Sequence, residues 1–323
     1  MTFRIHPLRR SPAWLALLAM PALLLMAMPA IAPAQDAPAA IDLRPDWQVG
    51  QTARYEIWSH RQRRTTMSMG GESHEVNVTM VTEGEVTWTV DRVNDDGSAT
   101  CTMVLDWLSM TVTDNEGGQQ IIDSRRGSGD VPAMHQALQA MAGQPVRFEI
   151  ASDGSVDSVA GVNTIRQRTE AEPMAPEDRD FVRSATELAL LIAAPDNANP
   201  GQTWQTRHAW SHEAGTMHYN IRHTLNDVGE VEGIPVATVY SEAQLELEVD
   251  DADMPPDAPP IDIRMTQGSR QGQVIFDLQR REAVGRNSLE QTTIEVTVRM
   301  PEQTLRQRID ETIQGQALRI SEE

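Results

Sequence analysis

Alternation of apolar and polar residues restricts the fold of this chain more than any other feature of its sequence. In residues 236–249, alanine, valine and leucine occupy one parity, and glutamate and glutamine occupy the other. Successive side chains of a β-strand point to opposite faces, so this segment is expected to form a strand with one buried face. The same alternation recurs in residues 53–57, 78–90, 99–105, 146–150, 204–210, 217–225, 274–278 and 294–300.

The pattern predicts a mainly β protein. We expect long antiparallel strands in one or two curved sheets, with a half-barrel of two β halves as one form of this arrangement. Two short helices are expected to cover an apolar face, in residues 131–142 and 176–193. The first opens with Pro132 and the second with Pro176 and two acids. Proline and acidic side chains are both favourable in the first turn of a helix.

Three local signals refine this prediction. Asn94-Asp95-Asp96-Gly97 predicts a hairpin turn, because asparagine, aspartate and glycine tolerate positive φ. Parity is lost near Trp107-Leu108, which predicts a β-bulge. Residues 303–320 carry apolar side chains at a spacing that fits both a helix and one face of a strand, and we favour the strand.

The first 34 residues have the order of an export signal. Three arginines among the first ten residues precede an apolar run, residues 15–28, and Ala32-Pro33-Ala34 forms a site for signal peptidase. A transmembrane anchor is the alternative, but prolines interrupt the run below the ~20 residues that a spanning helix needs. We predict cleavage before Gln35, export to the periplasm or the medium, and no transmembrane anchor in the mature chain.

Charge and cysteine content exclude several classes of protein. The chain has 27 basic and 47 acidic residues and a net charge of −20, which argues against binding nucleic acid or anionic membranes. Cys101 is the single cysteine, so no intrachain disulfide can form. Arg61, Arg63 and Arg64 form a basic cluster, which we interpret as a solvated strand end or as partners for acids of the same chain.

The chain divides by composition into successive segments. Residues 35–46 form a disordered lead-in rich in proline and alanine. A first β half (47–165), a helical connector (166–199) and a second β half (200–323) follow, with 47–323 as one continuous domain as the alternative.

A short repeat accompanies the division into halves. Val49-Gly50-Gln51-Thr52 and Pro200-Gly201-Gln202-Thr203 each start a strand flanked by tryptophan. A duplication would give two structurally similar β halves, and a chance match of three residues is the alternative.

The sequence contains no recognisable catalytic motif. His74-Glu75 and His212-Glu213 lack the second histidine of a zinc protease, and Gly127-Ser128-Gly129-Asp130 does not match a nucleophile elbow. His208 and His212 share a strand face but lie ~13 Å apart along it, so they are only weak candidates for a metal site. We expect no cofactor and favour a non-enzymatic protein.

Methionine is the residue type most suggestive of a binding site. Methionine fills cores, but it also lines pliable apolar cavities. We predict that a cavity between sheet and helices, if the protein has one, is lined by Met67, Met69, Met80, Trp88, Met103, Met134 and Met141.

The order of several turns and strand starts resembles an uncharacterised family of exported bacterial β-rich proteins. The matching segments are 47–51, 66–71, 90–100, 200–204 and 272–278. The family has no assigned activity, so the resemblance implies no catalytic residue, and it supports a strand at 303–320. At the level of fold alone, the pattern is similar to the half-barrel of periplasmic lipoprotein carriers.

These observations leave three functions open. The first is an exported, non-enzymatic binding or carrier module for an apolar or amphipathic small molecule. The alternatives are a structural or protein-interaction module of the cell envelope, and a secreted hydrolase with a non-standard carboxylate or histidine site.

Overall fold

The computed structural model describes most of the chain after residue 39. The described residues are 40–126, 131–154, 156–160, 194–212, 215–231, 233–249 and 259–320. The chain divides into units Met1–Pro38 and Ala39–Glu323, and every described residue belongs to the second unit. The predicted signal segment and the predicted helix at 176–193 lie outside the described residues.

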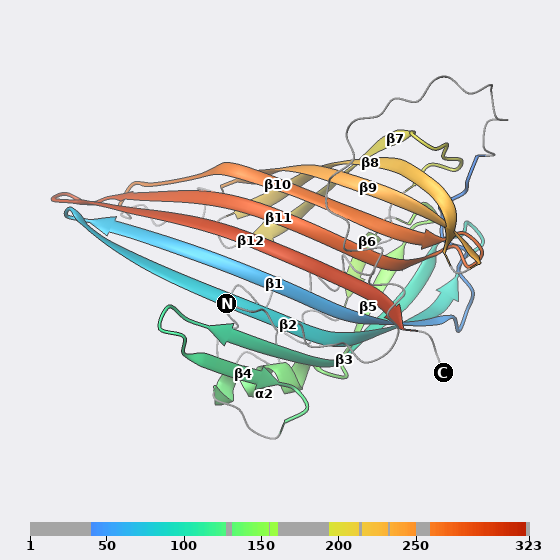
Figure 1. Cartoon of the computed structure of the whole chain (residues 1–323), viewed down its shortest axis with the longest axis horizontal. Helices are drawn as coiled ribbons and strands as arrows, with labels where there is room; N and C mark the ends of the chain where they lie inside the picture. Colours follow the sequence, from blue (N-terminus) through green and yellow to red (C-terminus); the bar gives the residue numbers. More distant parts are fainter. Residues whose placement is uncertain are drawn as a thin grey trace. The chain divides into compact units, whose positions relative to one another are not determined.

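The described residues form one large antiparallel sheet, as the alternation predicts (Figure 1). Its eleven-strand path runs β6-β5-β3-β2-β1-β12-β11-β10-β9-β8-β7, and β4 pairs with β3 off this path. Because β6 and β7 end the path, the described sheet is open and not closed into a barrel. The strands are β1 (Thr52–Met69), β2 (Glu72–Val93), β3 (Ala99–Thr113), β4 (Gln119–Asp123), β5 (Pro145–Ile150), β6 (Val156–Ala160), β7 (Thr203–His212), β8 (Gly215–Val231), β9 (Ile234–Glu248), β10 (Ile261–Asp277), β11 (Glu282–Arg299) and β12 (Thr304–Ile320).

The segment with ambiguous periodicity is a strand, as favoured from the sequence. Strand β12 lies between β1 and β11 and pairs with both along nearly its whole length. It therefore joins two meanders, β1-β2-β3-β5-β6 and β7-β8-β9-β10-β11, into one sheet (Figure 1).

The predicted turn and bulge are both present. The amide of Gly97, whose φ is +82°, bonds to the carbonyl of Asn94 at 3.0 Å in the turn between β2 and β3. Asp106 of β3 has no partner in the β2 register, because Leu105 pairs with Val86 and Trp107 with Glu85. This bulge explains why the parity of the sequence is lost at that point.

The two meanders begin with the same turn. The amide of Gly50 bonds to the carbonyl of Val90 at 2.8 Å, and that of Gly201 bonds to Leu225 at 2.6 Å. Both glycines have a φ of +83°. Glycine adopts this backbone conformation more readily than other residues because it has no Cβ. The side-chain oxygens of Gln51 and Gln202 each accept a bond from the amide three residues earlier, at 3.2 and 3.0 Å.

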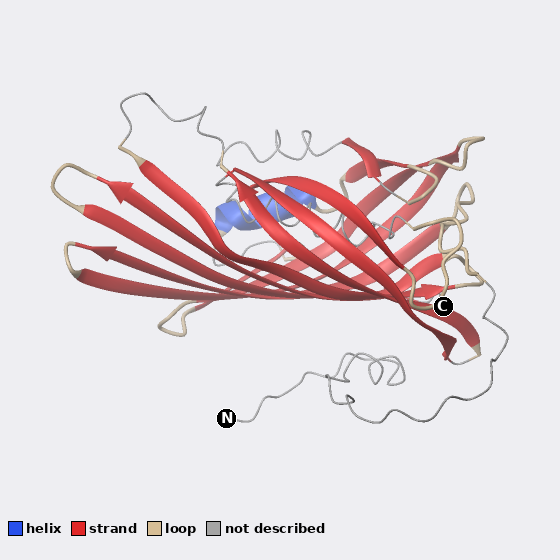
Figure 2. Ribbon diagram, turned by 90° about the horizontal axis from the view of Figure 1, so that it is seen from above, coloured by secondary structure: helices blue, strands red, loops and turns tan. Residues whose placement is uncertain are grey.

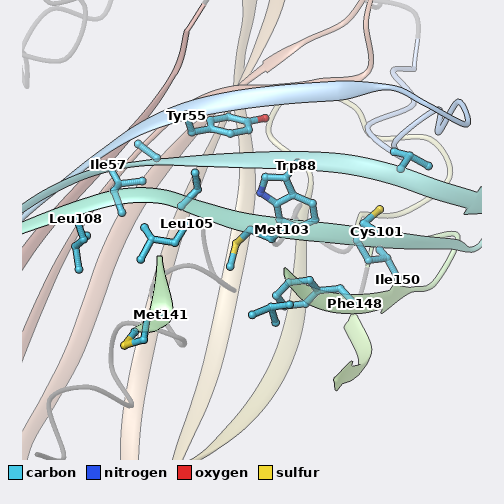
Figure 3. Packing of buried hydrophobic residues seen from close by; sticks show 14 of the residues in the cluster. Tyr55, Ile57, Trp88, Cys101, Met103, Leu105, Leu108, Met141, Phe148 and Ile150 are labelled. Carbon is cyan, nitrogen blue, oxygen red and sulfur yellow. The ribbon is translucent and has the colours of Figure 1, made fainter. Parts of the chain in front are cut away.

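A single described helix, α2 (Pro132–Met141), confirms the first predicted helix (Figure 2). Its Leu138 and Met141 pack into the main core with side chains of β1, β2, β3 and β5. Figure 3 shows Trp88, Met103 and Phe148 meeting at the centre of this core. Each such side chain contributes about 1.5–3 kcal/mol when it is fully buried. We call the face of the sheet that carries α2 the inner face, and the opposite face the outer face.

A second core covers the inner face of the other meander. Leu43, Ala194 and Ala198, from segments outside the strands, pack on side chains of β8, β9 and β10. An isolated bridge between Ile41 and Ala198 holds these two segments together. In the described part of the chain, no helix is long and apolar enough to cross a membrane.

Candidate ligand-binding face

The inner face changes in character along the length of its strands. Strand β1 shows this directly, because its pairing with β2 and β12 has no irregularity and every second residue faces inward. Tyr55 and Ile57 are buried in the main core. Farther along the same parity come Arg61 and Arg63, and Met67 and Met69 follow at the distal end. The inner face therefore has an apolar core, a polar band and an apolar distal end.

The structure separates the predicted cavity-lining residues into these zones. Trp88, Met103 and Met141 are 2–7% exposed in the main core, and Met134 packs against them. Trp88, Met103 and Met141 form part of the protein interior (Figure 3). Met80 is half-buried on the inner face, opposite Arg61 in the register.

The remaining two predicted residues, Met67 and Met69, lie at the distal end and are 37% and 47% exposed. Val76, across the hairpin from Thr65, shares their face and is 41% exposed. Apolar side chains of β10, β11 and β12 continue this surface in register. We define the distal apolar face as Met67, Met69, Val76, Ile261, Ile263, Val296, Val298, Leu305 and Ile309.

Charged and polar side chains form the band between the core and the distal apolar face. Arg61 of β1 donates two hydrogen bonds to Glu311 of β12, at 2.8 and 3.1 Å. The two side chains are only 12% and 14% exposed. The hydroxyl of Tyr219 on β8 donates to Glu290 on β11 at 3.3 Å, although β9 and β10 lie between their strands. This contact requires the inner face to be concave.

Three neighbouring strands build a polar cluster around a buried histidine. Nε2 of His223 on β8 lies 2.9 Å from Oγ1 of Thr206 on β7, and Nδ1 lies 2.8 Å from Oγ of Ser241 on β9. The ring of Trp204 stacks on the imidazole with centroids 5.3 Å apart. Burial, with smaller electrostatic contributions from His208 and Arg286, lowers the pKa of His223 to about 4. The imidazole is therefore neutral at pH 7 and exchanges hydrogen bonds with two hydroxyls.

The weak metal candidates do not gain support from the fold. Both His208 and His212 lie on β7, where they pair with Tyr219 and Gly215 of β8. Among the described residues, no group of three histidine, cysteine, aspartate or glutamate side chains is arranged to hold a metal ion. Burial, with the charges of Asp91 and Glu149, raises the pKa of Cys101 to about 12, so its thiol is an inert part of the core.

Reasoning from sequence alone did not find the His223 cluster or the acidic members of the polar band. Strand parity placed His223 and Tyr219 on one face, but it gave no sign of Ser241 or Glu290 beside them. The basic cluster was interpreted in part correctly: Arg61 pairs with Glu311 and Arg64 with Glu75. Their partners lie on other strands, so only the strand order could identify them.

This geometry defines a class of protein: an open antiparallel sheet with an apolar inner core and a partly exposed apolar end. Within this class, the chain belongs to a family of unknown function, DUF6263, whose model matches residues 96–280. The predicted membership of a family without an assigned activity is thus confirmed. No curated protein matches the chain.

The comparison with solved structures gives distant matches. A lipovitellin structure, titled for its lipid–protein interactions, is 10% identical with a TM-score of 0.43, and the match covers 82% of this chain. The chain spans only 25% of the length of that lipovitellin chain. A DUF1329 family protein from Desulfovibrio piger is 12% identical with a TM-score of 0.15, covering 79% of this chain and 83% of that one. At these TM-scores, neither likeness bears on function.

Proposed function

We propose that this protein is an exported, non-enzymatic binding module whose distal apolar face takes an apolar or amphipathic ligand. The observation that carries the proposal is the exposure of Met67, Met69 and Val76 on the same face as the core. Large apolar side chains clustered in solvent mark binding surfaces more often than isolated ones do. Methionine suits such a surface because its flexible thioether adapts to ligands of different shape.

The arrangement of zones supports an amphipathic ligand in particular. The distal apolar face runs directly into the polar band of Arg61 and Glu311 along β1 and β12. A ligand that lies along the strands would place an alkyl segment on the first and a polar group near the second. The distance from Met69 to Arg61 is eight residues, or ~26 Å of strand.

The test is uptake of a fluorescent fatty-acid probe by the delipidated chain that lacks residues 1–34. We expect saturable uptake that Met67→Glu and Met69→Glu together weaken at least tenfold, because each places a charge in the apolar surface. Thr66→Glu and Ser68→Glu form the matched control, since they add the same charges on the outer side of the same strand. Uptake that is absent, or equally reduced by both pairs, would rule out this face as the site.

Export is tested separately. The full chain is expressed in a Gram-negative host with a signal-peptidase inhibitor present or absent, and each fraction is analysed by mass spectrometry. We expect the product to begin at Gln35 outside the cytoplasm. A cytoplasmic product that retains residues 1–34 would contradict this part of the proposal.

A further inference from the structure

The outer face carries a hollow of about 520 Å³ in the middle of the sheet. It crosses β2, β1, β12, β11 and β10, on the side opposite α2 and the distal apolar face. A register shift in β10 between Met265 and Gln267 lies beside it. Such a bulge increases the local twist of a sheet, which accounts for a hollow on a surface otherwise expected to be flat.

Most of the lining comes from two adjacent cross-strand rows. The first row consists of Thr79, Gln62, Thr312 and Gln291, each paired in register with the next. Amide and hydroxyl side chains can both donate and accept hydrogen bonds. Within the described part of the chain, the side-chain amides of Gln62 and Gln291 bond to no other protein group, so both remain available to a ligand.

The second row consists of Asn77, Arg64, Asp310 and Thr293, and its one positive and one negative side chain are both held by hydrogen bonds. Asp310 accepts bonds from Thr293 at 2.8 Å and from Arg308 at 2.8 and 3.0 Å, and Arg64 is bound to Glu75. On the outer face, the lining holds one arginine, Arg64, and one acid, Asp310, so its net charge is zero in a protein of net charge −20. This surface therefore selects neither an anion nor a cation.

The spacing of the rows fits a ligand with a repeat. Adjacent strands present one amide or hydroxyl group every ~4.8 Å, and the rings of an extended sugar chain advance by roughly the same distance. On the same face of β1 as Gln62, Trp58 stacks on His60 with centroids 6.1 Å apart. A partly exposed indole provides a flat apolar surface for the C–H face of a sugar ring.

We propose that the outer hollow binds a neutral, extended oligosaccharide across the strands, with hydrogen bonds from the row that contains Gln62 and Gln291. Its polar groups replace the water that hydrates this row in the free protein. This site is independent of the distal apolar face, because the two lie on opposite sides of the sheet.

The experiment is calorimetric titration of the chain lacking residues 1–34 with cellohexaose, chitohexaose, maltohexaose and hexagalacturonate. We expect saturable binding of at least one neutral hexamer and weaker binding of the acidic one. Gln62→Ala and Gln291→Ala should each weaken binding about fivefold and abolish it together. Gln205→Ala, an exposed outer-face glutamine of β7 outside the hollow, should leave it unchanged.

Each outcome decides the proposal. Absence of binding to all three neutral hexamers overturns it, as does binding that survives the Gln62→Ala, Gln291→Ala double variant. Tighter binding of hexagalacturonate overturns the assignment of a neutral ligand. The double variant should take up the fatty-acid probe normally, so failure of this site and failure of the distal apolar face are distinguishable.

Discussion

Trp88 in the first meander and His223 in the second occupy corresponding positions. Trp88 lies two residues before Val90, and His223 lies two residues before Leu225. The backbone of Val90 or Leu225 hydrogen-bonds to the turn at the start of its own meander, which we call the launching turn. Trp88 stacks on Phe148 at 5.4 Å, and His223 stacks on Trp204 at 5.3 Å. The backbone plan is shared, but one position anchors an apolar core and the other anchors a hydroxyl-bonded cluster.

This comparison separates what the backbone determines from what the side chains determine. Both meanders have a register irregularity directly after the bond to the turn, at Val90/Arg92 and at Leu225/Asp227. The turn and the bulge therefore belong to the shared plan. The contents of each core are set by side chains, so substitutions at Trp88 and His223 should have different consequences.

The largest effect is expected for Trp88→Ala. Truncation of a buried tryptophan leaves a cavity, so the free energy of unfolding should fall by about 3–5 kcal/mol. His223→Ala should cost clearly less, because the histidine fills less apolar volume. Urea denaturation of both variants measures this difference, and equal losses would contradict the distinction between the two cores.

The next effect depends on pH and concerns only the second meander. The pKa of His223 is about 4 in the folded protein and 6.5 for the ordinary side chain, so the unfolded state binds the proton more readily. Stability is therefore complete above pH 6.5 and declines as the pH falls towards 4, by about 3 kcal/mol. His223→Gln should flatten the profile over this range in thermal unfolding. A wild-type profile that is already flat would show that His223 is not buried as described.

Gly84→Ala should cost about 1–3 kcal/mol, an effect confined to the first meander. A Cβ at this position would lie 2.6 Å from the carbonyl oxygen of Trp107 and 2.8 Å from Leu108 Cδ1, across the bulge at Asp106. Gly229→Ala is the matched control, since a methyl group added there would have no atom within 4 Å. Similar stability of the two variants in urea would argue against the tight bulge.

The smallest effects are expected in the turns that begin the two meanders, and Gln51→Ala should cost somewhat more than Gln202→Ala, because the side-chain amide of Gln51 also donates to Glu282 at 3.4 Å. Gln51→Ala and Gln202→Ala each remove the side-chain acceptor of one amide in a launching turn, at a cost of about 1 kcal/mol. Paired chemical denaturation should give two small losses, with the larger one for Gln51→Ala. A large loss for one variant alone would show that the two turns differ in importance.

Strand parity made much of the fold predictable. It located most of the strands, though not β4 or β6, and the bulge beside Trp107, and it placed Tyr219 and His223 on one face. Pro132 marked the start of the helix predicted at 131–142. The residue types at 94–97 predicted the turn between β2 and β3. These features depend on neighbours in the sequence, so a single chain is enough to find them.

The strand order was not predictable by the same means. Arg61 and Glu311 are 250 residues apart, and their contact exists only because β12 inserts beside β1. Parity gives the face on which a side chain lies but not the strand next to it. The polar band, the His223 cluster and the outer hollow all depend on that missing information. The methionines of the predicted lining are divided between the core and the distal apolar face for a related reason, because those on the strands share a face but lie at different positions along it.

The central position of β12 has a consequence for biosynthesis. Its residues follow those of every other described strand, so both meanders are synthesised before the strand that joins them. Until then, β1 and β11 are edge strands with unpaired backbone amides and carbonyls, through which nascent polypeptides can aggregate. A stop codon ahead of Thr304 would leave those edges permanently uncovered, and its product should depend on chaperones to remain dispersed.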